Sequence, residues 1–232
     1  MQMPTAHLIS IDQLEGPQAE RLNPAQVSAG RQVVRWAKDY LCKPHPELGR
    51  NGSVCPCVTA ALLRRSFYLR IEDNPHPAPP EIDVLVAEMG DVFSNLEPTA
   101  KQDAQYKTLL ILFPNLPPEH FDLLDGSQSR LKPDFVSRGY MVGQFHGRPP
   151  SNPGLWNPNF RPLVSDVPML VIRHMVPSDL PFLLDEERFA IAWFDRFGHR
   201  ATEAQRTMLR KAVPAATYAQ FEIVWRGSGV RA

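Results

Sequence analysis

Two basic side chains end a segment that otherwise has the composition of a buried strand. The run VPMLVIRHMVPSDLPFL, residues 167–183, is apolar at its start, is interrupted by Arg173 and His174, and ends near a Pro-Ser-Asp turn. Side chains of a strand alternate between two faces, so His174 shares a face with Leu170 and Ile172 while Arg173 points to the other. If the first face belongs to the core, the imidazole is buried and needs a partner.

A second histidine, His146, ends another strand-like segment, YMVGQFHG at residues 140–147. Irregular loops above strand ends bring polar groups together over a rigid sheet. The sequence therefore predicts one pocket that holds both His146 and His174, with these two residues and Arg173 as catalytic candidates. The alternative is that each histidine is a hydrogen-bonded structural residue.

A cysteine followed by proline, Cys55-Pro56, could supply a thiolate ligand for a metal. Haem-thiolate proteins often carry such a pair, and haem iron is held by a cysteine thiolate or a histidine. Cys55 and His174 are therefore the candidate iron ligands. The segment VCPCV does not predict zinc, because zinc sites use wider cysteine spacings and need two further ligands. The alternative is that Cys55 is a small buried residue at the start of a helix.

Arginines could hold the carboxylates of a cofactor or of a substrate, because a guanidinium binds a carboxylate through two parallel hydrogen bonds. A tryptophan in a proline-rich loop could wall the same pocket. The candidates for cofactor binding, in addition to Cys55 and His174, are Arg64, Arg70, Arg148, Arg161 and Trp156. For any single arginine, the alternative is a solvated surface side chain. For the tryptophan, it is a contact that holds the loop to the surface.

Asp179 offers a carboxylate close to the end of the strand that carries His174. Together with His146 and His174 it could complete a site in which two histidines and one carboxylate hold non-haem iron. The usual close spacing of the histidine and the carboxylate on one strand is missing here. A carboxylate two residues after a proline is also typical of a turn or a helix cap.

The elements that position these residues mix helices and strands. Asn23 and Pro24 begin an amphipathic helix, the apolar run in YKTLLILFPN predicts a central strand, and Phe189 with Trp193 marks a late helix. Residues 117–139 predict a helix with a break near Gly126 or Pro133, and YAQFEIVWRG is ambiguous. Neither a glycine-rich dinucleotide motif nor a P-loop is present.

We therefore expect an α+β fold with a mixed or mostly antiparallel central sheet, helices packed on it and long proline-rich loops. Residues 1–22 are expected to form an N-terminal strand and arm, and residues 23–232 a single domain. The 24 prolines cluster in the connections rather than in the predicted strands and helices.

The bulk composition restricts the partners. The chain has 232 residues, with 25 Lys+Arg and 25 Asp+Glu, so it has no basic surplus for nucleic acid or an anionic membrane. It has no apolar run long enough to span a bilayer and no evident secretory signal. Three cysteines, an odd count, fit a reduced cytoplasm better than a disulfide framework.

Three segments, WAKDYLCKPHPELGRNGSVCPCV, GYMVGQFHG and VPMLVIRHMVPSDLPFL, together resemble a bacterial family catalogued as domain of unknown function 6875. Members of that family often sit among natural-product genes. The cysteine segment of the family reads V-C-P-F, so Cys55 matches its pattern and Cys57 stands where phenylalanine is expected. More distantly, the order of segments is similar to the YqcI/YcgG family, some members of which are haem proteins that hydroxylate guanidine nitrogens.

These resemblances imply a haem-dependent oxygenase that acts on a small amine, guanidine or amino-acid-derived substrate in bacterial secondary metabolism. Such an enzyme would be a cytoplasmic oxidoreductase that uses iron, a small-molecule substrate and an electron-transfer partner, without nucleic acid or membrane partners. Two alternatives stay open. One is a non-haem metal or cofactor-free enzyme that uses His146, His174 and Asp179. The other is a non-catalytic binding module.

Overall fold

A single mixed sheet organises the chain in a computed structural model that describes residues 8–99, 101–151, 157 and 159–227. Within these residues the sheet has five strands in the order β1-β2-β3-β5-β4, and only β2 and β3 pair in parallel. All residues of β3 are buried, which confirms the predicted central strand. The strands are β1 (Leu8–Ser10), β2 (Phe67–Ile71), β3 (Thr108–Leu112), β4 (Tyr140–Phe145) and β5 (Met169–His174).

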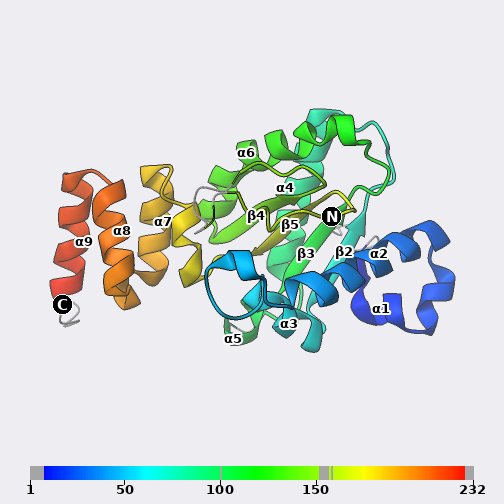
Figure 1. The fold of residues 1–232 in the computed structure, drawn as a ribbon, viewed down its shortest axis with the longest axis horizontal. Coiled ribbons are helices and arrows are strands. Elements are labelled where there is room, and N and C mark those ends of the chain that lie inside the picture. The colour runs from blue at the N-terminus through cyan, green and yellow to red at the C-terminus, as the bar shows by residue number, and fades with distance from the viewer. Residues whose placement is uncertain (1–7, 100, 152–156, 158, 228–232) are drawn as a thin grey trace.

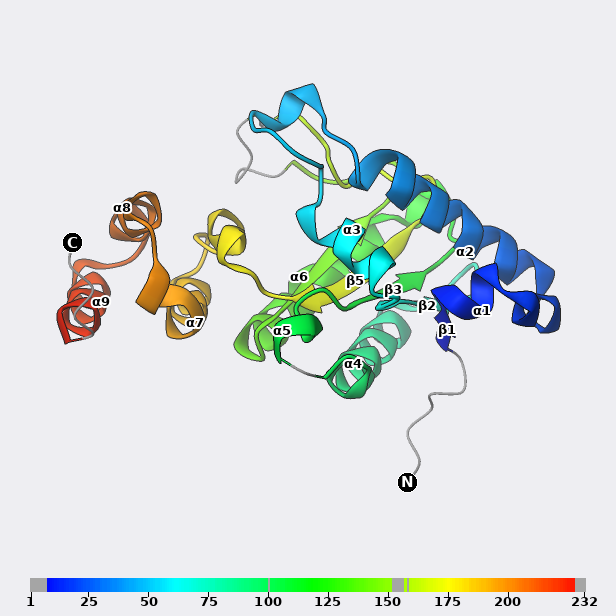
Figure 2. The same ribbon diagram turned by 90° about the horizontal axis from the view of Figure 1, so that it is seen from below.

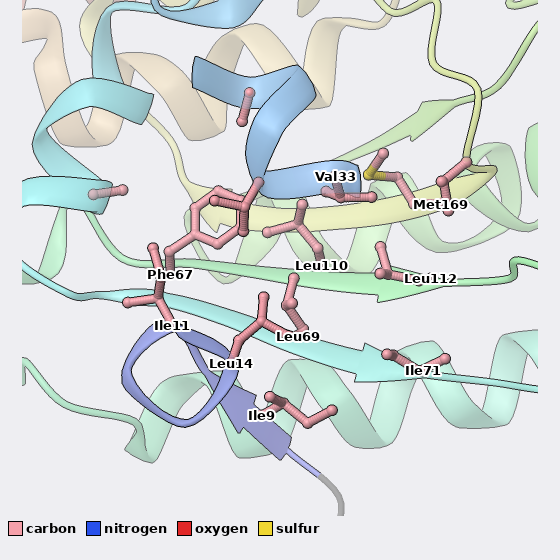
Figure 3. Close-up of a cluster of buried hydrophobic side chains, with 14 of the residues drawn as sticks. Ile9, Ile11, Leu14, Val33, Phe67, Leu69, Ile71, Leu110, Leu112 and Met169 are labelled. Atoms are coloured by element: carbon pink, nitrogen blue, oxygen red, sulfur yellow. The ribbon is translucent and has the colours of Figure 1, made fainter. Parts of the chain in front are cut away.

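Three helices cover one face of the sheet, and Figure 2 shows them lying together above the strands. They are α1 (Ile11–Glu15), α2 (Pro24–Trp36) and α3 (Pro56–Leu63). In the core beneath them, Leu14 of α1 and Val33 of α2 meet apolar side chains of β2, β3 and β5 (Figure 3). This face, called the α2 face below, carries the side chains of alternate strand residues such as Leu69 and Met169.

The opposite face of the sheet is covered by α4 (Pro79–Asn95) and α6 (Asp122–Ser137). Its core combines Phe93 of α4 and Phe135 of α6 with strand residues of the alternate register. The short helix α5 (Lys101–Ala104) precedes β3. The arrangement confirms the predicted α+β class, with one domain built around a mixed sheet and helices packed on it.

The last three helices form a group that extends to one side of the sheet, as Figure 1 shows. They are α7 (Glu187–Phe197), α8 (Glu203–Ala212) and α9 (Ala215–Gly227), and they share an apolar core of their own. A 3-10 segment, η6 (Pro177–Phe182), joins this group to β5. Other short 3-10 segments are η2 (Pro17–Arg21), η4 (Pro46–Leu48), η5 (Pro118–His120) and η7 (Gly198–Arg200).

Local sequence accounts for the start of α2. The side chain of Asn23 accepts a hydrogen bond from the backbone N–H of Ala25 at 2.9 Å, and Pro24 occupies the first helical position, as predicted. The helix continues into a π-helical segment, η3 (Ala37–Leu41), before the chain turns away. Trp36 and Tyr40, which lie near this end, are only partly buried and pack at the border of the core.

Two predictions about helices need correction. The break predicted near Gly126 or Pro133 is wrong, because α6 is continuous through both residues. Proline removes one helical hydrogen bond, but Phe135 and Val136, which follow it, are fully buried and hold the last turn against the sheet and α7. The ambiguous segment YAQFEIVWRG is helical and belongs to α9, where Phe221 packs face to face on Phe194 of α7 at 3.8 Å.

Candidate functional site

His146 and His174 lie on the same face of the sheet but near opposite ends of it. The antiparallel register places His174 opposite Tyr140, and His146 directly follows Phe145, which lies opposite Met169. Six residues of extended chain separate the two positions by about 20 Å. The predicted shared pocket is therefore wrong. Because β4 and β5 run in opposite directions, the C-terminal end of each strand lies beside the N-terminal end of the other.

His146 is a buried histidine whose two ring nitrogens both have partners. Its Nε2 lies 3.0 Å from Oδ1 of Asp125, and its Nδ1 accepts the backbone N–H of Arg148 at 3.2 Å. The second contact requires an unprotonated Nδ1, so Nε2–H donates to Asp125. The ring is 1% exposed and lies 4.8 Å from that of Phe121. His146 is therefore a hydrogen-bonded structural residue, which was the alternative prediction. Neither of its ring nitrogens is free to bind iron.

His174 lies between two aromatic rings, Phe93 of α4 at 5.2 Å and Tyr140 of β4 at 5.1 Å. Its Nε2 is buried and has no hydrogen-bond partner among the described residues. Burial, together with the nearby Lys107 ammonium, lowers the pKa of His174 to about 4. The imidazole is therefore neutral at physiological pH.

His174 should make the folded protein less stable in mild acid. The pKa of this histidine falls from 6.5 to about 4 on folding, so the unfolded chain binds the extra proton more readily. Its contribution is fully present above pH 6.5 and is lost as the pH falls towards 4. After allowance for partial exposure, we expect a loss of about 1–2 kcal/mol.

Urea unfolding of the wild type and of His174→Gln at pH 7 and pH 4.5 measures this loss, because glutamine cannot take up the proton. The free energy of unfolding should fall more in the wild type than in the variant. An equal fall in both proteins would contradict the assignment of this acid sensitivity to His174.

Lys107 is a buried charge that the sequence analysis did not single out. It is 1% exposed, its Nζ donates to the carbonyl of Leu96 at 2.6 Å, and it lies 4.8 Å above the ring of Phe93. Burial lowers the pKa of this ammonium group. The signal that could have found it is a lysine directly before an otherwise continuous apolar strand.

Arg173 points to the α2 face, as strand alternation predicted, and forms a paired contact with Asp179. Its Nη1 and Nη2 donate to the two carboxylate oxygens at 2.7 and 2.6 Å. Asp179 is 2% exposed and also accepts the backbone N–H of Val176 at 2.8 Å. Both carboxylate oxygens therefore accept hydrogen bonds. Asp179 caps the η6 turn, which was the alternative prediction for this residue. Arg173 Nη1 also donates to the backbone carbonyl of His174 at 2.9 Å, but neither histidine ring belongs to this cluster.

Two thiols lie close enough to this ion pair to interact with it electrostatically. Cys55 is the N-cap of α3 and its backbone N–H donates to the carbonyl of Leu41 at 2.9 Å, while Cys57 lies in the first turn. The charge of Arg173 interacts with both thiols. Burial and the neighbouring Cys55 raise the pKa of Cys57. Both cysteines are partly exposed. We call Cys55, Cys57, Arg173 and Asp179 the thiol site.

Part of the sheet on the α2 face is only partly buried. Leu110 of the central strand is 3% exposed, whereas Gly143, Phe145 and Val171 of β4 and β5 on the same face are only partly buried. A Cβ atom added to Gly143 would meet no closer atom than Phe145 Cε2, at 3.5 Å. Such a Cβ atom would therefore lie in ordinary van der Waals contact with Phe145. We call Gly143, Phe145 and Val171 the open sheet face.

Aromatic rings border the open sheet face. Trp36 lies edge-on to Phe145 at 5.8 Å and contacts Tyr40 at 5.9 Å. His45 stacks on Phe160 with ring centres 4.5 Å apart. Trp36, Tyr40 and Phe145 pack against the same apolar core as Cys55. We call Trp36, Tyr40, His45 and Phe160 the aromatic border. The thiol site and the aromatic border adjoin the same partly exposed apolar surface.

The arginines predicted to bind a cofactor do not gather around this surface. Only Arg161 is tied to its aromatic border, through a hydrogen bond from Nη1 to the carbonyl of Phe160 at 3.2 Å. The others bind elsewhere: Arg64 pairs with Asp103 at 3.2 Å, Arg70 with Glu72 at 3.6 Å and Arg148 with the carbonyl of Pro118. Trp156 lies outside the described residues. The described chain contains no group of three or more side chains placed to hold a metal ion.

Taken together, these features define an α+β protein with a thiol site beside a partly open apolar sheet face. Residues 30–208 match the family described as Domain of unknown function (DUF6875), and the chain belongs to this family. The matched segment includes the thiol site and the aromatic border. No curated protein and no solved structure matches the chain, and no comparison shows a similarity to the YqcI/YcgG family. None of the described helices has the length and apolar character needed to cross a membrane.

Proposed function

We propose that the protein is an oxidoreductase whose reactive centre is the thiol of Cys55. The observation that carries this proposal is the position of Cys55, at the first turn of α3, next to Arg173 and beside the partly exposed apolar sheet face. Functional cysteines lie in partly exposed, electropositive surroundings, whereas structural cysteines are fully buried and inert.

The surroundings of Cys55 are electropositive. The unpaired backbone N–H groups at the start of a helix carry partial positive charge, and Cys55 occupies that end of α3. The guanidinium of Arg173 adds a second positive charge near this thiol. Asp179 holds that guanidinium in place through two hydrogen bonds, so Arg173 acts as a positioning and electrostatic residue.

We further propose that the Cys55 thiolate is a ligand of haem. The residues present fit such a group in two respects. A thiolate is an established iron ligand, and the open sheet face is a partly exposed apolar surface with aromatic rings at its border. His146 and His174 do not fit, because their side chains lie on the opposite face of the sheet. Cys55 is therefore the residue that would hold the iron in this proposal.

With haem bound at Cys55, the thiolate would supply the chemistry of oxygen activation. In this proposal the aromatic border, including Trp36 and Phe160, excludes water and orients a small amine, guanidine or amino-acid-derived substrate. Arg161, which donates to the carbonyl of Phe160 at that border, would be the predicted arginine that holds a propionate. An electron-transfer partner and a cytoplasmic location, where thiols stay reduced, belong to the same proposal.

Titration of the purified protein with haemin tests the proposal. We expect a Soret band that grows to one haem per chain, and Cys55→Ser should weaken haem binding about tenfold or more. Cys42→Ser is the matched control, because Cys42 packs in the same core region but is not part of the thiol site. Circular dichroism of each variant separates a lost ligand from a lost fold.

Other outcomes would redirect the proposal. If the protein stays colourless with haemin but Cys55 reacts with iodoacetamide much faster than Cys42, a cofactor-free thiol enzyme is supported instead. If no haem binds and Cys55 is as inert as Cys42, the oxidoreductase proposal fails. The remaining hypothesis is then that the protein is a non-catalytic binding module.

A further inference from the structure

We infer that a groove beside α2 binds an amino acid that carries a second cationic group. The assignment of this compound as the substrate of the oxidoreductase rests on the proposed function, but its binding to the groove does not. We call this surface the α2 groove. Its lining includes Leu22, Val27, Arg35, Trp36, Asp39 and Asp166.

The α2 groove is large enough for a small molecule, because its volume of about 850 Å³ lies within the range of small-molecule sites. One side of it is the exposed surface of α2 and of the π-helical segment that follows. Residues on that surface recur three or four positions apart and therefore form one stripe, which is about 16 Å long from Ser28 to Asp39. The rest of the lining comes from the chain around η2 and from Asp166, which precedes β5.

Three charged side chains of the α2 groove are not paired within the protein. Across the part of the chain that the structure describes, Arg35, Asp39 and Asp166 form no side-chain hydrogen bond or ion pair. Lys38, which is next to Asp39 in sequence but outside the groove, pairs with Glu15 at 2.8 Å. Opposite charges thus line one groove without neutralising each other, so they are available to a ligand.

Two further charged residues line the α2 groove. Arg31 donates through Nε and Nη2 to the carbonyl of Leu14 at 3.3 and 3.2 Å, so two of its three nitrogens are already bonded. The carboxylate of Glu20 has no partner among the described residues. The unpaired charges of the groove are therefore one guanidinium, that of Arg35, and three carboxylates.

This set of charges defines the chemistry of the ligand. A guanidinium binds a carboxylate through two parallel hydrogen bonds, so Arg35 would hold the carboxylate of the ligand. Asp39 and Asp166 would each accept a cationic group. A compound with one carboxylate and two cations, which is the charge set of a basic amino acid, complements the groove, whereas an anionic compound would be repelled by the carboxylates.

Trp36 connects the α2 groove to the open sheet face. Its indole lines the groove and lies edge-on to Phe145 at 5.8 Å. The face of an aromatic ring also attracts a cation. A ligand in the groove would therefore lie beside the surface at which the proposed function places the reaction, and this continuity supports the assignment of the ligand as the substrate.

Isothermal titration calorimetry of the full-length, haem-free protein tests the site, with L-lysine as the probe. Low ionic strength is needed, because salt screens exposed charges. We expect one L-lysine to bind per chain. Cadaverine, which keeps both cations but has no carboxylate, should bind about tenfold more weakly. The same loss is expected for L-norleucine, which has no cation on its side chain.

Two variants assign the charges to the ligand groups. Arg35→Gln should weaken the binding of L-lysine about tenfold and leave that of cadaverine unchanged, whereas Asp39→Asn should weaken the binding of both compounds. Lys38→Gln is the matched control, because it removes a neighbouring charge that does not line the groove and should bind L-lysine as the wild type does. Circular dichroism checks that each variant is folded.

Several results would overturn the inference. They are no binding of L-lysine, equal affinities for the three compounds, and equal losses of affinity in Arg35→Gln and Lys38→Gln. The calorimetry uses no haem, so its failure is distinct from that of the proposed function. Binding of L-lysine by a protein that takes up no haem would support the groove and contradict only the haem proposal. Haem uptake without binding of L-lysine would do the reverse.

Discussion

Replacing Asp179 with alanine is expected to lower the free energy of unfolding by about 3 kcal/mol or more. The substitution leaves the Arg173 guanidinium, whose side chain is only 27% exposed, without the carboxylate that accepts its two hydrogen bonds. It also removes the acceptor of the Val176 backbone N–H, which fixes the start of η6. Urea unfolding followed by circular dichroism measures the change.

Two further variants separate charge from shape. Asp179→Asn keeps an oxygen for the Val176 N–H but removes the negative charge, so it should lose less stability than alanine. The double variant Arg173→Met with Asp179→Leu removes both charges and should be more stable than Asp179→Ala alone. If alanine and the double variant were equally unstable, the unpaired guanidinium would not be the cause.

The second large effect is expected for Trp193→Ala, which should cost about 3–5 kcal/mol. The indole is fully buried in the core of α7–α9, and its Nε1–H donates to the carbonyl of Pro177 at 3.2 Å. Gln205 of α8 donates to the same carbonyl at 2.9 Å. Trp193 therefore connects the C-terminal helices to the turn that carries Asp179.

Trp193→Phe is the matched control, because it keeps most of the aromatic volume and removes only the N–H donor. We expect about 1–2 kcal/mol for this change. The Pro177 carbonyl keeps its bond from Gln205, so the turn itself should persist. Equal losses for alanine and phenylalanine would show that the hydrogen bond, rather than buried volume, dominates at this position.

The sequence predicted the individual elements well, because their signals are local. The cap at Asn23, the apolar run of β3 and the alternation that sends Arg173 and His174 to opposite faces depend on neighbouring residues, and the structure confirms each of them. The continuity of α6 through Pro133 could not be predicted, because burial of the residues that follow overrides the local cost of proline.

The candidate site was harder to predict because it depends on strand direction. His146 and His174 look alike in sequence, since each ends a strand. Their separation follows from the antiparallel pairing of β4 and β5, which the long proline-rich connection between the strands does not reveal. The approach of Cys55 to Arg173 could not be predicted either, because only the tertiary fold brings these two residues together. The sequence shows Arg173 and Asp179 as two opposite charges six residues apart, but it does not show that they form an ion pair.

The position of β3 in the middle of the sheet also has a consequence for folding kinetics. Thr108 hydroxyl donates to the carbonyl of Ile172, 64 residues later, while Ser66 at the entrance to β2 donates to the carbonyl of Tyr106, 40 residues later. β2 and β5, the two neighbours of the central strand, can pair with it only after long loops of chain have closed. The entropy of closing these loops is lost before the sheet gains its stabilising contacts. Because long-range contacts of this kind slow folding, we expect the chain to fold more slowly than helical bundles do.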